Sequence, residues 1–234
     1  MKNDASILLA IDSATSTCTV ALGHQGRVLS ERTLKTDRRH NEALPGLVEE
    51  VLVESNQSWN DLSGIVVSIG PGSFTGLRVG VSYAKGAALA LDIPILPVST
   101  LSILANSFLR TVAYSGKFTV LIPARRGEAF GQTFQFIDGV VSPEYEPKLI
   151  DISQAIALIN NGVALVGEGC EQFVSQIKEN FPEALLFPEI SPSGDSLLTS
   201  GFELLERGIT FPSICDIEPV YLKEFTVKSA YIIR

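Results

Sequence analysis

The residues with the clearest potential for chemistry are the glycines of one short segment, IGPGSFTGLRVG at residues 69–80, between a predicted buried strand and a predicted helix. Glycine-rich loops in that position commonly bind phosphate through backbone amides. The spacing here matches neither common phosphate motif. No lysine stands where a Walker loop requires one, and the third glycine of a dinucleotide fingerprint is replaced by Thr75.

The helix that follows this segment carries small residues at every fourth position: Gly76, Gly80 and Ala84. A helix face with small side chains lets the backbone of another segment approach closely. Three interpretations are open at this point. The stripe packs against the protein's own sheet, or it faces a second chain, or the loop before it holds an anion.

Two further positions follow predicted strands and so could line a site. Asp12 ends the first strand and precedes several hydroxyl residues, which could hold a metal–phosphate group. No glycine accompanies it to let backbone amides approach a phosphate, so a turn or cap role is favoured. Gly167-Glu168-Gly169 stands where an adenine-binding turn could lie, but Glu168 adds a negative charge unsuited to a nucleotide.

The remaining candidates favour structural roles. His40 has no second histidine four residues later, so no His-x-x-x-His metal pair exists, and a surface position at a helix start is favoured. The turn Arg125-Arg126-Gly127-Glu128 is predicted as a surface β-turn, with a partner or anion contact as the alternative. No G-x-S-x-G elbow is present, and no cysteine lies near a histidine in the sequence. We therefore expect no catalytic residue, no metal site and no cofactor.

Composition limits the class of protein. The 234 residues suffice for one large domain or two small ones, and 45% hydrophobic against 19% charged residues excludes a disordered chain. The formal net charge of −8 disfavours direct binding of nucleic acid. No apolar run approaches the ~20 residues of a membrane helix. Three scattered cysteines suit reduced thiols, so we expect a cytoplasmic protein.

The elements that must position these residues follow a regular order in the first half of the chain. Apolar alternation and helical spacing predict three strands, a helix, a strand, a helix and a strand. Their residue ranges are 7–13, 17–23, 27–34, 41–55, 64–69, from Ser73 or Thr75 to 91, and 93–98. Three strands with short connections form an antiparallel meander, and the rest forms a parallel crossover unit.

The second half partly repeats that plan. Strands are predicted at residues 117–122, 129–137, 140–149 and 163–166, helices at 151–160, 171–180 and 193–207, and an extended segment at 219–224. Asp138-Gly139 is a strong hairpin turn. The repetition predicts a duplicated, two-lobed α/β protein whose boundary lies within residues 100–112. We divide the chain into residues 1–105 and 106–234.

Several of these stretches resemble one known family. SIGPGSFTGLRVG is similar to the signature of the TsaB (YeaZ) family of bacterial tRNA threonylcarbamoyladenosine synthesis. Four further stretches occur in the same order as in members of that family: LLAIDSATSTCTVAL, RRHNEALPGLVEEVL, ARRGEAF and PVYLKEF. The resemblance is dense over residues 6–130 and thin from there to Pro219, and nothing in residues 175–216 matches. Pro123 stands where the family often has an aspartate, so no role is carried over to that position.

The resemblance implies a two-lobed fold of the actin, Hsp70 and sugar-kinase type (ribonuclease H-like), each lobe a mixed sheet with a three-strand antiparallel meander flanked by helices. It also implies a non-catalytic partner of the transferase TsaD, which modifies the adenosine 3′ of certain anticodons and holds a metal with a His-x-x-x-His pair. The ATPase TsaE docks on the TsaB–TsaD pair, tRNA is met only through that complex, and free family members form homodimers. No membrane association is implied.

The helix after residue 72 is the interface that the resemblance and the stripe together indicate. The interface residues we expect are Ser73, Phe74, Thr75, Gly76, Leu77, Arg78, Gly80, Val81 and Ala84. An Ala84→Trp change should then abolish pairing in a folded monomer, whereas unfolding would mean that the stripe packs internally. Two alternative functions stand beside the scaffold: a metalloprotease-like or nucleotide-hydrolysing enzyme of the same superfamily, and a self-associating homodimer.

Overall fold

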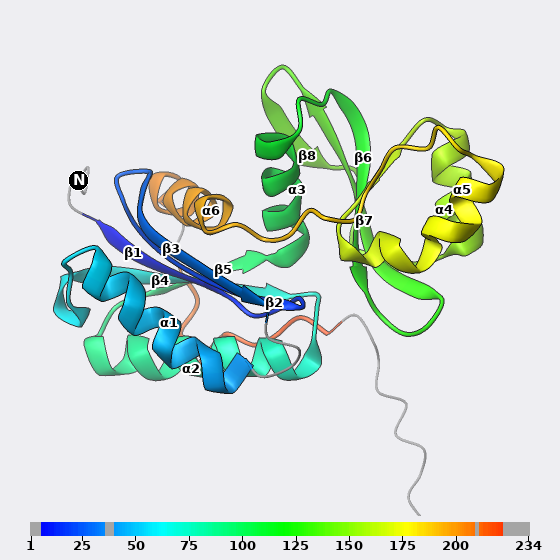
Figure 1. The fold of residues 1–234 in the computed structure, drawn as a ribbon. Coiled ribbons are helices and arrows are strands. Elements are labelled where there is room, and N and C mark those ends of the chain that lie inside the picture. Colours follow the sequence, from blue (N-terminus) through cyan, green and yellow to red (C-terminus); the bar gives the residue numbers. More distant parts are fainter. Residues whose placement is uncertain (1–5, 36–39, 209–210, 222–234) are drawn as a thin grey trace, which may run out of the picture.

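The structure, a computed structural model, describes residues 6–35, 40–208 and 211–221 and has two α/β lobes (Figure 1). The first lobe is built on a five-stranded sheet of order β3-β2-β1-β4-β5. Its elements are β1 (Ile7–Asp12), β2 (Thr17–His24), β3 (Arg27–Lys35), α1 (His40–Glu54), the 3-10 turn η1 (Trp59–Asp61), β4 (Leu62–Gly70), α2 (Phe74–Leu91) and β5 (Ile95–Ser99).

The predicted order of the first lobe is confirmed. Strands β1, β2 and β3 pair antiparallel as a meander, whereas β4 pairs parallel with both β1 and β5. Each expected helix lies within a residue or two of its predicted bounds. The Ser73 side chain caps α2 by accepting a hydrogen bond from the Gly76 amide at 3.2 Å.

Two hydrophobic layers enclose this sheet. Helices α1 and α2 cover one face, where Ile11, Leu44 and Ala84 belong to one core cluster. Helix α6 (Gly194–Glu206) covers the other face, where Leu198 packs with Leu8. Figure 1 shows α1 and α2 on one side of the sheet and α6 on the other.

The second lobe has a six-stranded sheet in which β11, β10, β6, β7 and β8 lie in that order and β9 pairs with β7. Its elements are α3 (Thr100–Thr111), β6 (Gly116–Pro123), β7 (Glu128–Ile137), β8 (Val140–Pro143), β9 (Lys148–Asp151), α4 (Ile152–Asn160), β10 (Ala164–Val166), η2 (Glu168–Phe173), α5 (Val174–Asn180), β11 (Leu186–Phe187) and, after α6, η3 (Ile214–Asp216).

Three expectations for this half need correction. The strand predicted at 140–149 is two strands that each pair with β7, because β8 ends at Pro143 and β9 begins only after Pro147. The helix predicted at 171–180 begins as a 3-10 turn and becomes α-helical only at Val174. Helix α3, within the predicted boundary at residues 100–112, was not predicted at all.

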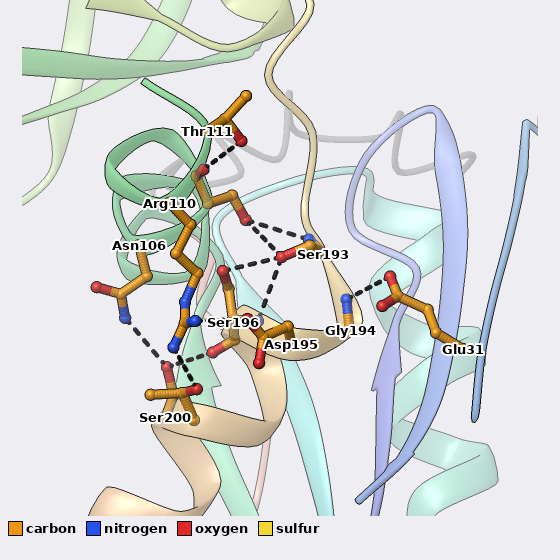
Figure 2. A network of polar contacts seen from close by, with 11 residues as sticks. Glu31, Asn106, Arg110, Thr111, Ser193, Gly194, Asp195, Ser196 and Ser200 are labelled. Atoms are coloured by element: carbon orange, nitrogen blue, oxygen red, sulfur yellow. Dashed lines mark hydrogen bonds and ion pairs between the residues drawn. The ribbon is translucent and has the colours of Figure 1, made fainter. Parts of the chain in front are cut away.

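The two lobes meet where α3 and α6 cross. Ser193 and Ser107 share a hydrogen bond of 3.2 Å, Arg110 pairs with Asp195 at 2.5 Å, and Glu31 accepts the Gly194 amide at 2.7 Å (Figure 2). Helix α3 packs on the second sheet, whereas α6 returns to the first sheet. The division into residues 1–105 and 106–234 stays a prediction, although α6 comes from the second segment.

None of the helices in the described ranges has the length and apolar character that crossing a bilayer requires. The predicted extended segment at 219–224 and the PVYLKEF stretch lie partly outside the described residues, as does the start of RRHNEALPGLVEEVL.

Candidate functional site

The glycine segment packs against the turn between β1 and β2. The Ser73 amide donates to the Ala14 carbonyl at 2.7 Å, and the Ser13 hydroxyl donates to the Gly76 carbonyl at 2.8 Å. A Cβ atom at Gly76 would lie 2.0 Å from the Ser13 carbonyl oxygen, and one at Gly80 would lie 2.3 Å from the Ser13 hydroxyl. The glycines are therefore required by a close approach within the chain, and the loop's polar groups are used internally.

This geometry decides among the three interpretations of the small-residue stripe. Gly76, Gly80 and Ala84 are buried against the protein's own sheet and β1–β2 turn. Leu77 and Val81 are buried beside them. Five of the nine expected interface residues thus cannot contact a partner in this fold, because the stripe faces the core. Packing against the own sheet, one of the three open interpretations, is the correct one.

The other four expected interface residues lie on the surface. Ser73, Phe74, Thr75 and Arg78 are exposed at the start of α2. They continue into an exposed helix face that the sequence analysis missed. We define the outer α2 surface as the exposed residues Phe74, Thr75, Arg78, Ser82, Gly86, Leu89 and Ala90.

The outer α2 surface carries three hollows that all include Ser82. One of about 420 Å³ lies around Phe74 and Arg78, and one of about 250 Å³ lies between Arg78 and the segment 217–221. The third, about 450 Å³, is lined mainly by Trp59, Tyr83 and small residues of α2. The three hollows therefore adjoin one another at Ser82, and the third is mainly apolar.

The sequence does contain a signal for this surface. Ser82, Gly86 and Ala90 form a second small-residue stripe at i, i+4 and i+8. The first stripe is flanked by Leu77 and Val81, the pattern of a helix face that is buried. The second stripe is followed by Tyr83, Ala87 and Leu91 in the same way, so the sequence alone does not distinguish the buried stripe from the exposed one.

Asp12 lies in a different environment from the one expected. It is the last residue of β1, its carboxyl is fully buried, and neither oxygen has a hydrogen-bond partner among the described residues. The expected turn or cap role is therefore wrong. Burial raises its pKa to about 6, and Glu168 adds to the rise. The Ser68 hydroxyl and the Ala14 amide oppose that rise from nearby, although neither has the geometry of a hydrogen bond.

Glu168 approaches Asp12 from the second lobe. Its Oε1 accepts the Ser16 amide at 3.2 Å, which links η2 to the β1–β2 turn. A Cβ atom at Gly169 would lie 2.5 Å from the backbone of Leu121, so this predicted adenine turn packs tightly on β6. Within the described ranges, no three side chains among His, Cys, Asp and Glu are grouped to hold a metal ion.

Two surface expectations have different outcomes. His40 begins α1 as predicted, but it is buried rather than exposed, and burial lowers its pKa against the opposing effect of the Thr15 backbone. Arg125 and Glu128 form the predicted charged turn, in which the two side chains pair and the Glu128 amide donates to the Arg125 carbonyl at 2.9 Å. Contact of this turn with an anion or a partner protein stays a prediction.

A family model described as TsaD: tRNA N6-adenosine threonylcarbamoyltransferase matches residues 27–228. The protein named tRNA threonylcarbamoyladenosine biosynthesis protein TsaB from Escherichia coli (strain K12) is 29% identical over 228 residues, which cover 92% of this chain and 94% of that protein. The protein of the same name from Bacillus subtilis (strain 168) is 35% identical over 147 residues, covering 62% of this chain and 63% of the other.

Solved structures agree with the sequence relatives. YeaZ from Pseudomonas aeruginosa is 27% identical and superposes with a TM-score of 0.77, covering 93% of this chain and 100% of that chain. A second structure, of an uncharacterized protein with similarity to peptidase YEAZ from Pseudomonas aeruginosa, gives a TM-score of 0.79 at 27% identity with the same coverage. The expected two-lobed α/β fold is confirmed, and it is shared with YeaZ.

Proposed function

The chain belongs to the TsaD family of tRNA N6-adenosine threonylcarbamoyltransferases and takes part in tRNA threonylcarbamoyladenosine biosynthesis, and on that premise we propose that it is a non-catalytic subunit that pairs with and supports a TsaD transferase. The observation that carries this proposal is the outer α2 surface. It is exposed, hollowed and partly apolar, which are properties of a surface that another protein covers.

Leu89 illustrates the point, since this residue of the outer α2 surface is 63% exposed and precedes Ala90, which lines the apolar hollow around Trp59 and Tyr83. Burying an exposed leucine in an interface contributes about 1.5–3 kcal/mol. A TsaD subunit packed along α2 would bury this side chain. TsaE would then dock on the resulting pair, and the tRNA would be held by the other subunits, which suits the net charge of −8.

The non-catalytic role is supported by the glycine segment. Its Ser73 amide and Gly76 carbonyl bond to the β1–β2 turn, and a Cβ atom at Gly76 would already overlap that turn. A phosphate would need the same space. The alternative of a nucleotide-hydrolysing or metalloprotease-like enzyme predicts ATP hydrolysis or bound metal in the pure chain, and both assays are direct.

Size-exclusion chromatography with light scattering tests the proposal, on the chain alone and mixed with TsaD of its own organism. We expect a one-to-one complex that replaces any homodimer. Leu89→Asp should abolish it by placing a charge on the apolar surface. Leu185→Asp, at a leucine 51% exposed on the second lobe, is the matched control and should pair normally.

Two results would contradict the proposal. A mixture that shows no complex, with or without ATP and TsaE, would remove the scaffold role. A homodimer that persists unchanged when TsaD is added would favour the self-associating alternative. In either case the tRNA modification should be measured with TsaD, TsaE and tRNA, with and without this chain, because a scaffold must raise its yield.

A further inference from the structure

Arg78 differs from four arginines found elsewhere on the two lobes. Arg32, Arg110, Arg125 and Arg207 each pair with a carboxylate. No ion pair among the described residues includes Arg78, which contacts aromatic side chains instead. This exposed cation at the start of α2 shares a hollow with the Glu218 carboxylate, but the two form no ion pair.

Three contacts nevertheless fix the position of this side chain. The guanidinium carbon lies 4.0 Å from the centre of the Phe74 ring and 6.0 Å from that of the Tyr221 ring. The Arg78 Nε atom donates a hydrogen bond to the Tyr221 hydroxyl at 3.1 Å, and the two rings are 5.2 Å apart. Stacking on aromatic rings holds the planar guanidinium and leaves its terminal N–H groups available to donate two hydrogen bonds to one carboxylate.

The segment 214–221 supplies the second ring and is itself anchored along α2. The Val220 amide donates to the Ile69 carbonyl at 2.7 Å, and Lys85 Nζ donates to the Cys215 carbonyl at 3.1 Å. Ile217 is buried in the core beneath α2. The segment thus runs antiparallel to the helix and ends with Tyr221 against Arg78 and Phe74.

Arg78 also stands between two of the hollows of the outer α2 surface, since it lines both the one around Phe74 and the one beside residues 217–221. Phe74 and Tyr221 are each 39% exposed, so two aromatic rings and a fixed guanidinium share one surface patch. Arginine and tyrosine in well-packed pockets dominate the energetics of protein interfaces.

We infer that Arg78 is the anchor through which the outer α2 surface binds a carboxylate of the partner protein, and that residues 214–221 hold its guanidinium in place for that contact. This inference rests on the proposed pairing with TsaD. The partner is identified by its chemistry as a surface with an acidic side chain flanked by apolar groups, which complements a stacked cation between two hollows. Tyr221 is a positioning residue.

Isothermal titration calorimetry of the full chain against TsaD of its own organism, at about 50 and about 300 mM salt, tests this. Arg78→Gln should weaken binding about 30-fold or more and reduce its salt dependence, as expected for loss of a central charged contact. Arg78→Lys keeps the positive charge but loses the planar pair of N–H donors, so this variant should bind with intermediate affinity and retain the salt dependence.

Tyr221→Phe removes only the hydroxyl that accepts from Arg78 and should weaken binding about 2- to 10-fold. The matched controls are Arg207→Gln, just after α6, and Tyr114→Phe, after α3; both should leave the affinity within about 2-fold of the wild type. Circular dichroism and thermal unfolding of each variant verify the fold, since Arg78 and Tyr221 are exposed.

The outcomes separate the two proposals. If Arg78→Gln binds within about 2-fold of the wild type at both salt concentrations while Leu89→Asp does not bind, the anchor inference is wrong and the pairing stands. If the wild-type chain itself binds no TsaD, the proposed function fails and the anchor inference fails with it. A salt dependence that Arg78→Gln leaves unchanged would also overturn the carboxylate contact.

Discussion

Replacing Asp12 by asparagine should make the protein more stable at neutral pH. The folded protein buries this carboxyl completely and gives it no hydrogen-bond partner among the described residues, which raises its pKa from 3.8 to about 6. Between about pH 4 and pH 6 the folded state therefore holds a proton that the unfolded chain has lost. Stability must fall as the pH rises through that window, and the loss is complete above about pH 6.

The size of the effect follows from the shift. A difference of about 2 pKa units corresponds to about 3 kcal/mol between the protonated and ionised forms. Asparagine has nearly the shape of the carboxyl and stays neutral, so Asp12→Asn should recover up to about 3 kcal/mol at pH 7.5 and almost nothing at pH 4. For a chain of this length that gain corresponds to about 6–12 °C in melting temperature.

Differential scanning calorimetry of wild type and Asp12→Asn from pH 4 to pH 8 measures this directly. The difference between the two curves isolates Asp12 from other titrating groups such as His40. Asp138→Asn, in the exposed Asp138-Gly139 hairpin turn, is the control and should shift the melting temperature little at any pH. A melting temperature of Asp12→Asn equal to or below that of the wild type at pH 7.5 would refute the reasoning. It would mean that the ionised carboxylate has a favourable partner.

Three further changes test the packing described above. Gly76→Ala should lower the free energy of unfolding in urea by about 1–3 kcal/mol, because its Cβ atom would meet the Ser13 carbonyl. Gly86→Ala, on the open side of α2, should raise that free energy by about 0.5–1 kcal/mol. Equal effects of the two changes would contradict the assigned faces of the helix. Glu31→Gln should cost about 0.3–1 kcal/mol by removing a negative charge from the start of α6, and a loss that high salt does not reduce would argue against that charge effect. A thiol reagent at pH 8 should label one cysteine of the native chain, Cys215, because Cys18 and Cys170 are buried and burial raises the pKa of Cys18 to about 12; rapid labelling of either would refute their burial.

The sequence predicted the framework of the first lobe because its signals there are local. Strand β1 is a compact apolar run, polar and apolar residues alternate along β2, and Ser73 marks the start of α2. The burial of Ala84 could not be read in the same way. A small residue suits both a core that needs close approach and an interface that needs it, and only the packing of α2 on the first sheet distinguishes the two.

Long-range contacts explain the other errors. Helix α3 has no side-chain cap, and its core residue Phe108 is buried by strands of the second sheet, so its environment is set by residues that come later in the chain. His40 is buried by the fold although its residue type and position favour the surface. Of the expected interface residues, Phe74 and Arg78 are exposed as a partner contact requires, whereas the contact of Arg78 with Tyr221 joins positions 143 residues apart and had no local signal.

The return of α6 to the first sheet has a consequence for how the protein folds during synthesis. Leu8 and Ala10 emerge early from the ribosome, but the helix that covers their side of the sheet is made of residues 194–206. The nascent first lobe therefore exposes one apolar face of its sheet until most of the chain has been translated. Such contacts across large sequence separations slow folding and favour aggregation of incomplete chains. A shortened form that ends before α6 would keep that apolar face uncovered, so the full length of the chain is needed to complete even the lobe that is made first.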